Sequence, residues 1–143
     1  MHKDVMQPST VTDLVDVLEH AIRLLRRLST AGGLSHTASS TLSRLIREGP
    51  MRITELANAE AASQPGMTQL VSRMEREGWV ARAASPDDRR GVVVTVTDTG
   101  ADLMRRRRTE RTDSLRAMFD GLDPADRAAI TAALPALARL VTA

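Results

Sequence analysis

The segment from residue 63 to residue 78 constrains the fold of this chain more than any other. Ser63 is a favourable residue at a helix N-cap, and Pro65 is tolerated in the first turn of a helix. Apolar residues then recur at i, i+3, i+4 and i+7, which predicts one buried helical face. Gly78 follows as a helix terminator. The apolar positions are Met67, Leu70, Val71 and Met74.

Two short stretches come directly after this helix, at residues 79–83 and 92–97, and together they are rich in β-branched residues. Residues 85–88, Ser-Pro-Asp-Asp, have the composition of a turn, so the stretches predict a β-hairpin. Arg89 and Arg90 lie at its tip. A polar-faced helix followed by an arginine-tipped hairpin is the arrangement of a winged helix-turn-helix, which binds duplex DNA.

The rest of the chain predicts further helices. Apolar residues at helical spacing predict a first helix over about residues 11–28, and Ser35 caps a second, which Gly49-Pro50 ends. Thr54 is the expected N-cap of a short third helix. A long helix should run from residue 97 or 98 to about residue 119, and a last one from Asp123-Pro124, with Pro135 kinking it or shifting its start. The inward residues of the second helix should be Ala38, Leu42, Leu45 and Ile46.

Composition excludes several classes of function. The net charge of +2 is too small to identify a nucleic-acid-binding protein. Trp79 and Phe119 are the only aromatic residues. This disfavours binding of single strands and RNA, because their bases stack on aromatic side chains. The chain has no cysteine, which excludes disulfides and thiolate metal sites. No apolar run is long enough to span a membrane, so we expect a soluble protein in the cytoplasm.

The residues themselves resemble the MarR family of bacterial transcriptional regulators along the whole chain. The resemblance lies in six segments at family spacing. They are Ile53-Thr54-Glu55-Leu56-Ala57, Ser63-Gln64-Pro65, Leu70-Val71 with Arg73-Met74-Glu75, Gly78-Trp79-Val80, Asp88-Arg89-Arg90-Gly91, and Val94-Thr95-Val96-Thr97 with Gly100.

This resemblance implies a mainly α protein with a small β-hairpin wing, built as one domain over residues 1–143. The winged helix-turn-helix module would occupy about residues 34–100, and dimerisation helices about residues 8–30 and 101–143. It implies a homodimer on an inverted-repeat operator, and the apolar stripes of the terminal helices agree, because one small module could not cover them. Leu14, Leu18, Leu134 and Leu137 are the expected dimer contacts.

The polar face of the recognition helix supplies the expected DNA contacts. Glutamine suits adenine, arginine suits guanine, and the methyl group of threonine can contact thymine. Ser63 is expected to cap the helix and to contact a DNA phosphate through its backbone, and Pro65 is expected to lie beside this contact. The expected base contacts are Gln64, Thr68, Gln69, Ser72 and Arg73.

At the wing, Arg90 matches the family arginine that enters the minor groove, and Arg89 would contact a phosphate or the groove. Asp88 would repel DNA, so we interpret it as a carboxylate that orients an arginine side chain.

Resemblance also implies repression relieved by a small amphipathic or aromatic ligand. The candidates for binding such an effector are His20, Arg23 and His36. The resemblance implies that these residues border the effector cleft. An ordinary packing role for both histidines remains open.

The sequence bears on two other classes of protein, an enzyme and a protein-binding adaptor. An enzyme is disfavoured, because no catalytic or metal-ligand spacing involves the three histidines, and no cofactor motif is present. A winged-helix adaptor that binds protein remains open, although the outward face has no apolar anchor. Residues 105–108 are four arginines that point in four helical directions, so we expect a largely solvated stretch in which Asp102 can pair with Arg106.

Overall fold

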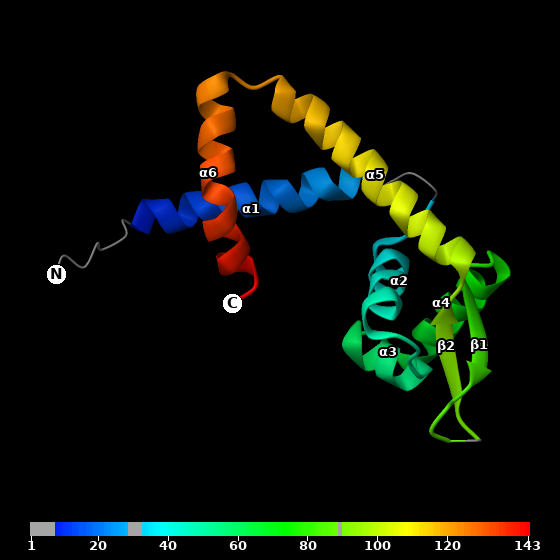
Figure 1. The fold of residues 1–143 in the computed structure, drawn as a ribbon. Helices are drawn as coiled ribbons and strands as arrows, with labels where there is room; N and C mark the ends of the chain where they lie inside the picture. The colour runs from blue at the N-terminus through cyan, green and yellow to red at the C-terminus, as the bar shows by residue number, and fades with distance from the viewer. Residues whose placement is uncertain (1–7, 29–32, 89) are drawn as a thin grey trace. The chain divides into compact units, whose positions relative to one another are not determined.

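Over residues 8–28, 33–88 and 90–143, which are those that the computed structural model describes, the chain forms six helices and one two-stranded antiparallel hairpin (Figure 1). The predicted order of elements is therefore confirmed. The elements are α1 (Pro8–Leu28), α2 (His36–Glu48), α3 (Ile53–Ala59), α4 (Gln64–Arg76), β1 (Val80–Ala84), β2 (Val92–Val96), α5 (Asp98–Asp120) and α6 (Pro124–Val141).

Side-chain caps begin four of these helices, α2, α4, α5 and α6, as the sequence predicts. The hydroxyl of Ser35 accepts a hydrogen bond from the Ala38 N–H, and Asp123 caps α6 in the same way. The prediction of Thr54 as the cap of α3 is wrong. The N-cap is Arg52, two residues earlier, and the helix begins at Ile53, because the carboxylate of Glu55 accepts a hydrogen bond from the Arg52 N–H at 2.9 Å.

The hairpin differs from its predicted bounds by one residue. Val80 pairs with Val96 and Ala84 with Val92, so the first strand starts one residue later than predicted. Gly78 adopts a φ of 79°, a left-handed conformation that lets the chain reverse between α4 and β1. Met51 adds an isolated bridge to Val94, with backbone hydrogen bonds of 3.1 and 2.7 Å. The hairpin is thus anchored to the segment before α3.

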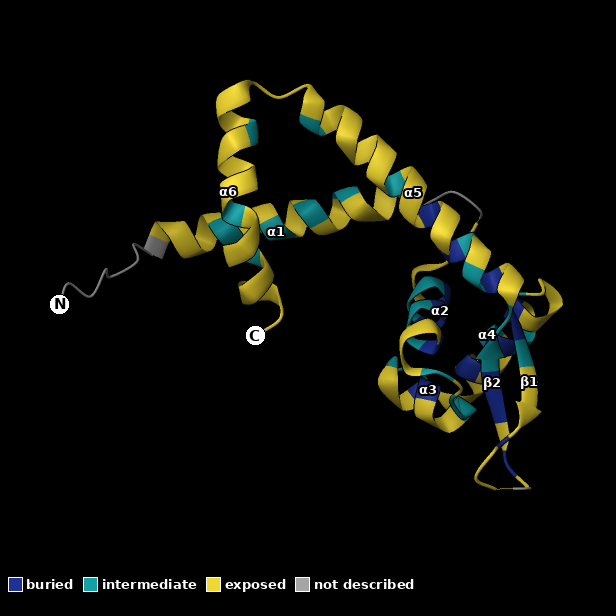
Figure 2. Cartoon of the chain, viewed as in Figure 1, coloured by how far each residue is buried: buried dark blue, intermediate teal, exposed yellow. Residues whose placement is uncertain are grey.

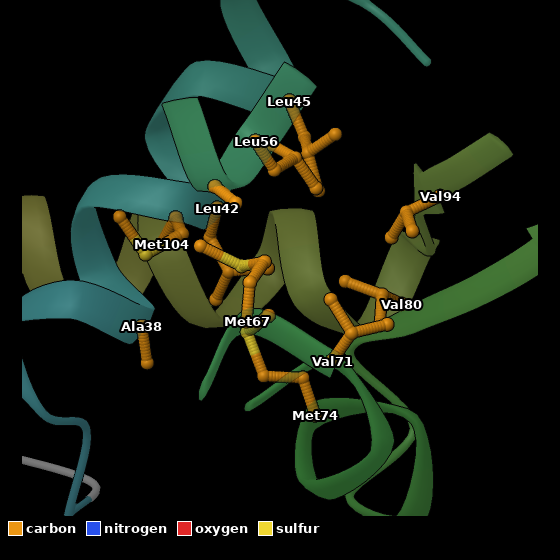
Figure 3. Packing of buried hydrophobic residues seen from close by; sticks show 11 residues of the cluster. Ala38, Leu42, Leu45, Leu56, Met67, Val71, Met74, Val80, Val94 and Met104 are labelled. Atoms are coloured by element: carbon orange, nitrogen blue, oxygen red, sulfur yellow. The ribbon is translucent and has the colours of Figure 1, made fainter. Parts of the chain in front are cut away.

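One apolar core holds α2, α3, α4 and the hairpin together, with Met104 from α5 (Figure 3). Three of the four predicted inward residues of α2 are buried, but Ile46 is 46% exposed, so that prediction is wrong. Leu70 is half-buried at the edge of the core. The core residues are Ala38, Leu42, Leu45, Leu56, Ala57, Met67, Val71, Met74, Val80, Val94 and Met104.

The start of α5 lies against the end of the turn after α4. The hydroxyl of Thr97 donates to the Gly78 carbonyl oxygen at 2.5 Å and accepts from the Gly100 N–H at 3.1 Å. A Cβ at Gly100 would lie 2.2 Å from the backbone oxygen of Trp79. Only glycine fits there, so this contact fixes where α5 leaves the hairpin.

The chain divides into two compact units, with the boundary between Arg108 and Thr109 inside α5. In the second unit, α6 contains no buried residue (Figure 2). The helix begins at Pro124 and continues through Pro135, so Pro135 does not shift the start of α6. Large apolar side chains are exposed to solvent on α6 and also on α1, in the first unit. Those at least 40% exposed are Val11, Val15, Val17, Ile22 and Leu25 in α1, and Ile130, Leu134, Leu140 and Val141 in α6.

Candidate nucleic-acid interface

The N-terminus of α4 is exposed and capped. Ser63 accepts a hydrogen bond from the Gly66 N–H at 3.1 Å, as predicted for an N-cap. Gln64 and Pro65 follow in the first turn, and both are exposed. The N-terminus of a helix carries partial positive charge and favours anions. This end of α4 can therefore face a phosphate.

The face of α4 opposite the core is polar. Met67, Val71 and Met74 are buried, so the helical period turns the predicted contact residues toward solvent. Gln64, Thr68, Gln69 and Arg73 are exposed, and Ser72 is half-buried. The Thr68 hydroxyl donates to the Gln64 carbonyl oxygen at 2.9 Å. The methyl group of Thr68 and the acceptor lone pairs of its oxygen then remain for a base.

Arg82, beside this face, is not among the residues that the sequence patterns predict. Arg82, in β1, donates to the Glu75 carboxylate at 2.5 Å and to the Ser72 hydroxyl at 3.2 Å. The signal that could have found it was strand alternation, which puts Arg82 on the same hairpin face as the buried Val80.

The wing is held by hydrogen bonds within its turn and by one ion pair. The Ser85 N–H donates to the Gly91 carbonyl oxygen at 2.8 Å. Asp88 accepts from the Arg90 N–H at 3.0 Å, and its other oxygen lies 3.5 Å from the Arg52 guanidinium. Among the described arginines, Arg52, beside α3, is therefore the one that pairs with Asp88. Arg90 is exposed, and Arg89 lies outside the described residues.

A cavity of about 310 Å³ lies between the start of α2 and the last turns of α4. Its lining combines apolar side chains with Arg73 and Glu77. None of the three predicted effector residues is among the lining residues: His20 and Arg23 are exposed on α1, and His36 is exposed at the start of α2. The lining is Gly33, Leu34, Ser35, Ala38, Leu70, Arg73, Met74, Glu77 and Trp79.

An ion pair joins α2 to the end of α3. Arg44 lies 2.7 Å from Glu60, whose side chain is 8% exposed, and 3.0 Å from Glu48. Burial alone would raise the pKa of Glu60, but hydrogen bonds from Ser40 and Arg44 outweigh it and lower that pKa below its ordinary value. The ion pair therefore fixes α2 against the end of α3, and both helices share one core with α4.

The arginine run in α5 is not simply solvated, contrary to our expectation. Arg107 is 4% exposed, because it continues the inward stripe that Gly100 and Met104 begin at helical spacing. The expected pairing of Asp102 with Arg106 is also wrong, since Asp102 pairs with Arg105 one residue earlier.

The predicted dimer contacts occupy the terminal helices. Leu14 and Leu18 are half-buried in α1, Leu137 is half-buried in α6, and Leu134 is 55% exposed.

Neither a metal-binding cluster nor a membrane-spanning helix is present among residues 8–28, 33–88 and 90–143. No group of three or more histidine, aspartate and glutamate side chains could hold a metal ion. No helix there is long and apolar enough to cross a membrane.

Comparisons with known proteins agree with this geometry. The MarR family model matches residues 34–92. An uncharacterized HTH-type transcriptional regulator of Mycobacterium bovis is 30% identical over 130 residues, which are 91% of each chain. The homoprotocatechuate degradative operon repressor of Escherichia coli is 31% identical over 74 residues, about half of each chain. A crystal structure of a putative transcriptional regulator from Pseudomonas aeruginosa has a TM-score of 0.77 at 27% identity, covering 94% of this chain and 97% of that one. This chain belongs to the MarR family of winged helix-turn-helix transcriptional regulators.

Proposed function

We propose that the protein is a homodimeric repressor that binds an inverted-repeat operator in duplex DNA and leaves it when a small amphipathic or aromatic ligand binds. In this proposal α4 enters the major groove, and Arg90 at the wing enters the neighbouring minor groove. Residues 34–100 would form the DNA-binding module, and residues 8–30 and 101–143 the dimerisation helices.

The observation that carries the proposal is the two-faced character of α4. Its inner face is locked into the core by Met67, Val71 and Met74, while the outer face presents exposed amides and a threonine methyl group. Such side chains match the donors, acceptors and methyl groups of base edges. A protein interface would instead need an aromatic or aliphatic anchor at its centre, so DNA is favoured over an adaptor role.

Dimerisation is supported by the apolar side chains that the terminal helices expose. Leu134 and Ile130 on α6 and Val15 on α1 are each at least 40% exposed in the single chain. Large exposed apolar stripes are typical of interfaces. A second copy of the chain would cover them and would carry a second α4, so that two half-sites lie about one DNA turn apart, roughly 34 Å.

The cavity beside α4 supports release by a ligand. Its volume of about 310 Å³ is at the lower end for small-molecule sites, and its lining offers an aromatic ring at Trp79 and a cation at Arg73. An amphipathic acid fits that chemistry. Because Leu70 and Arg73 belong to α4, a ligand there would act directly on the helix proposed to bind DNA. The relative named as a repressor supports repression as the sense of regulation.

The experiment that tests DNA binding is a selection of bound fragments from sheared genomic DNA at near-physiological salt. We expect a short inverted repeat with half-sites about one turn apart. Gln69→Ala should lose part of this motif, whereas Asn58→Ala, which removes an exposed amide from α3, should keep it. Recovery of no motif by the wild-type protein would contradict the proposal and favour the adaptor.

Dimerisation has its own test in sedimentation of the free protein. Leu134→Asp should shift the wild-type dimer toward the monomer, because a carboxylate would be buried in the interface. Asp120→Ala, at an exposed position in α5, is the matched control and should leave the dimer intact. A wild-type protein that sediments as a monomer would contradict the homodimer.

A further inference from the structure

Arg82 brings the wing strand and the DNA-facing helix together. Gly78 reverses the chain after α4, and β1 then runs back along the helix. Strand alternation places Arg82 on the same face as Val80, which is buried in the core against α4. Ser72 and Glu75 are three residues apart in α4 and so share one helical face. The guanidinium of Arg82 reaches both.

The chemistry of this contact suits a positioning role. The guanidinium nitrogen that donates to Glu75 lies 2.5 Å from the carboxylate, and a second nitrogen lies 3.2 Å from the Ser72 hydroxyl. A planar guanidinium that uses two nitrogens fixes orientation as well as distance. Ser72 accepts the bond from Arg82 and so keeps its own hydrogen for donation.

We propose that Arg82 is a positioning residue, which through Glu75 and Ser72 fixes the recognition helix α4 relative to the wing and thereby sets sequence specificity without contacting DNA. The inference rests on the proposed function. α4 and the wing would contact different grooves, so a specific complex needs both at a fixed separation. Non-specific binding depends on charge and is insensitive to that separation.

The competing interpretation is that Arg82 contacts a phosphate itself. The two interpretations predict different measurements. Loss of a phosphate contact weakens binding to every sequence and lowers the dependence of log K on log salt by about 0.9. Loss of a positioning contact weakens binding to the operator alone, while binding to unrelated DNA and the salt dependence stay as they were.

The experiment measures the affinities of the full-length protein for two duplexes of equal length, one carrying the motif that the wild-type protein selects and one scrambled. The variants are Arg82→Met, Glu75→Gln, the pair together, and the charge swap Glu75→Arg with Arg82→Glu. Arg76→Met removes the same charge from the end of the same helix and is the matched control. Thermal unfolding of each variant accompanies the binding data. Both partners of the pair are more than one-third exposed, so we expect little change in stability.

We expect Arg82→Met and Glu75→Gln each to lower affinity for the selected duplex at least about tenfold, since specific contacts contribute roughly 10³–10⁷ in affinity. Affinity for the scrambled duplex should change less than about twofold. The double variant should lose no more than either single one, and the charge swap should recover most of the specificity. Arg76→Met should leave the ratio of the two affinities unchanged.

Three results would overturn the inference. One is a fall for both duplexes in Arg82→Met with a lower salt dependence, which would identify a phosphate contact. Another is a charge swap that binds no better than the single variants. Both would leave the proposed function standing. A wild-type protein that selects no motif would overturn the proposed function together with this inference.

Discussion

The hydroxyl of Thr68 donates a hydrogen bond to the backbone carbonyl oxygen of Gln64, one helical turn earlier, at a distance of 2.9 Å. This bond uses the only hydrogen that the hydroxyl can donate. The oxygen can still accept a hydrogen bond but can no longer donate one, and the methyl group can contact the C5-methyl of thymine.

We predict that Thr68→Val retains operator binding, whereas Thr68→Ser weakens it. Serine lacks the methyl group, and burial of one such group contributes about 0.8 kcal/mol, which is roughly a fourfold change in affinity. Titration of the selected duplex measures both. Replacing the contacted thymine by uracil should weaken the wild-type protein to a similar degree and leave Thr68→Ser unaffected. Equal losses for valine and serine would show that the hydroxyl contributes and would contradict this assignment.

The exposed Arg90 should contribute to DNA binding and little to folding. Its backbone N–H is held by Asp88, and that bond survives replacement of the side chain. We predict that Arg90→Ala weakens binding to all duplexes, lowers the salt dependence, and leaves the melting temperature nearly unchanged. Asp87→Ala, on the same exposed turn, is the control and should strengthen binding by removing a repulsive charge. Unchanged affinity in Arg90→Ala would contradict the wing assignment.

Ser63 should have separable roles in stability and in binding. Ser63→Ala removes the acceptor of the Gly66 N–H, and loss of such a cap costs about 1 kcal/mol. Ser63→Asp keeps an acceptor and adds a negative charge that the helix N-terminus stabilises. We predict that aspartate preserves the free energy of unfolding, measured by urea denaturation, yet weakens DNA binding through repulsion of the phosphate. If aspartate bound DNA as well as serine, the phosphate would not lie at this helix end.

Local patterns predicted most of the fold because they depend on neighbouring residues. The caps Ser35, Ser63 and Asp123, the buried stripe of α4 and the hairpin follow from spacing and turn chemistry within one element. The wrong cap at Thr54 shows the limit, because a serine or threonine preference was outweighed by the Glu55 carboxylate reaching back to Arg52.

The contacts that organise the candidate interface could not be predicted in this way. Arg82 contacts Ser72 only because the chain reverses at Gly78, and Arg52 contacts Asp88 although α3, α4 and β1 separate them in the sequence. Arg107 looked like one member of a solvated run, yet the stripe of α5 buries it. Each depends on where one element lies against another, and residue spacing within a single element does not specify that.

The pair between Arg44 and Glu60 gives the free energy of unfolding a predictable dependence on pH. Hydrogen bonds from Ser40 and Arg44 overcome the effect of burial and lower the pKa of Glu60 below its ordinary value of 4.5. A carboxyl whose pKa is lower in the folded state stabilises that state above its unfolded pKa. That contribution is lost as pH falls from about 4.5 through the lower folded pKa.

We therefore predict that Glu60→Gln lowers the free energy of unfolding at neutral pH by about 1 kcal/mol, a modest figure because Arg44 still reaches water. The difference from the wild type should shrink as acid protonates Glu60, because the wild type then loses the same charge. Urea denaturation across the acid range measures this convergence. Glu48→Gln removes a more exposed partner of the same arginine and should have a smaller effect. The two proteins could instead differ in their free energy of unfolding by the same amount at every pH. That result would show that the shape or packing of residue 60, and not its charge, stabilises the contact between α2 and α3.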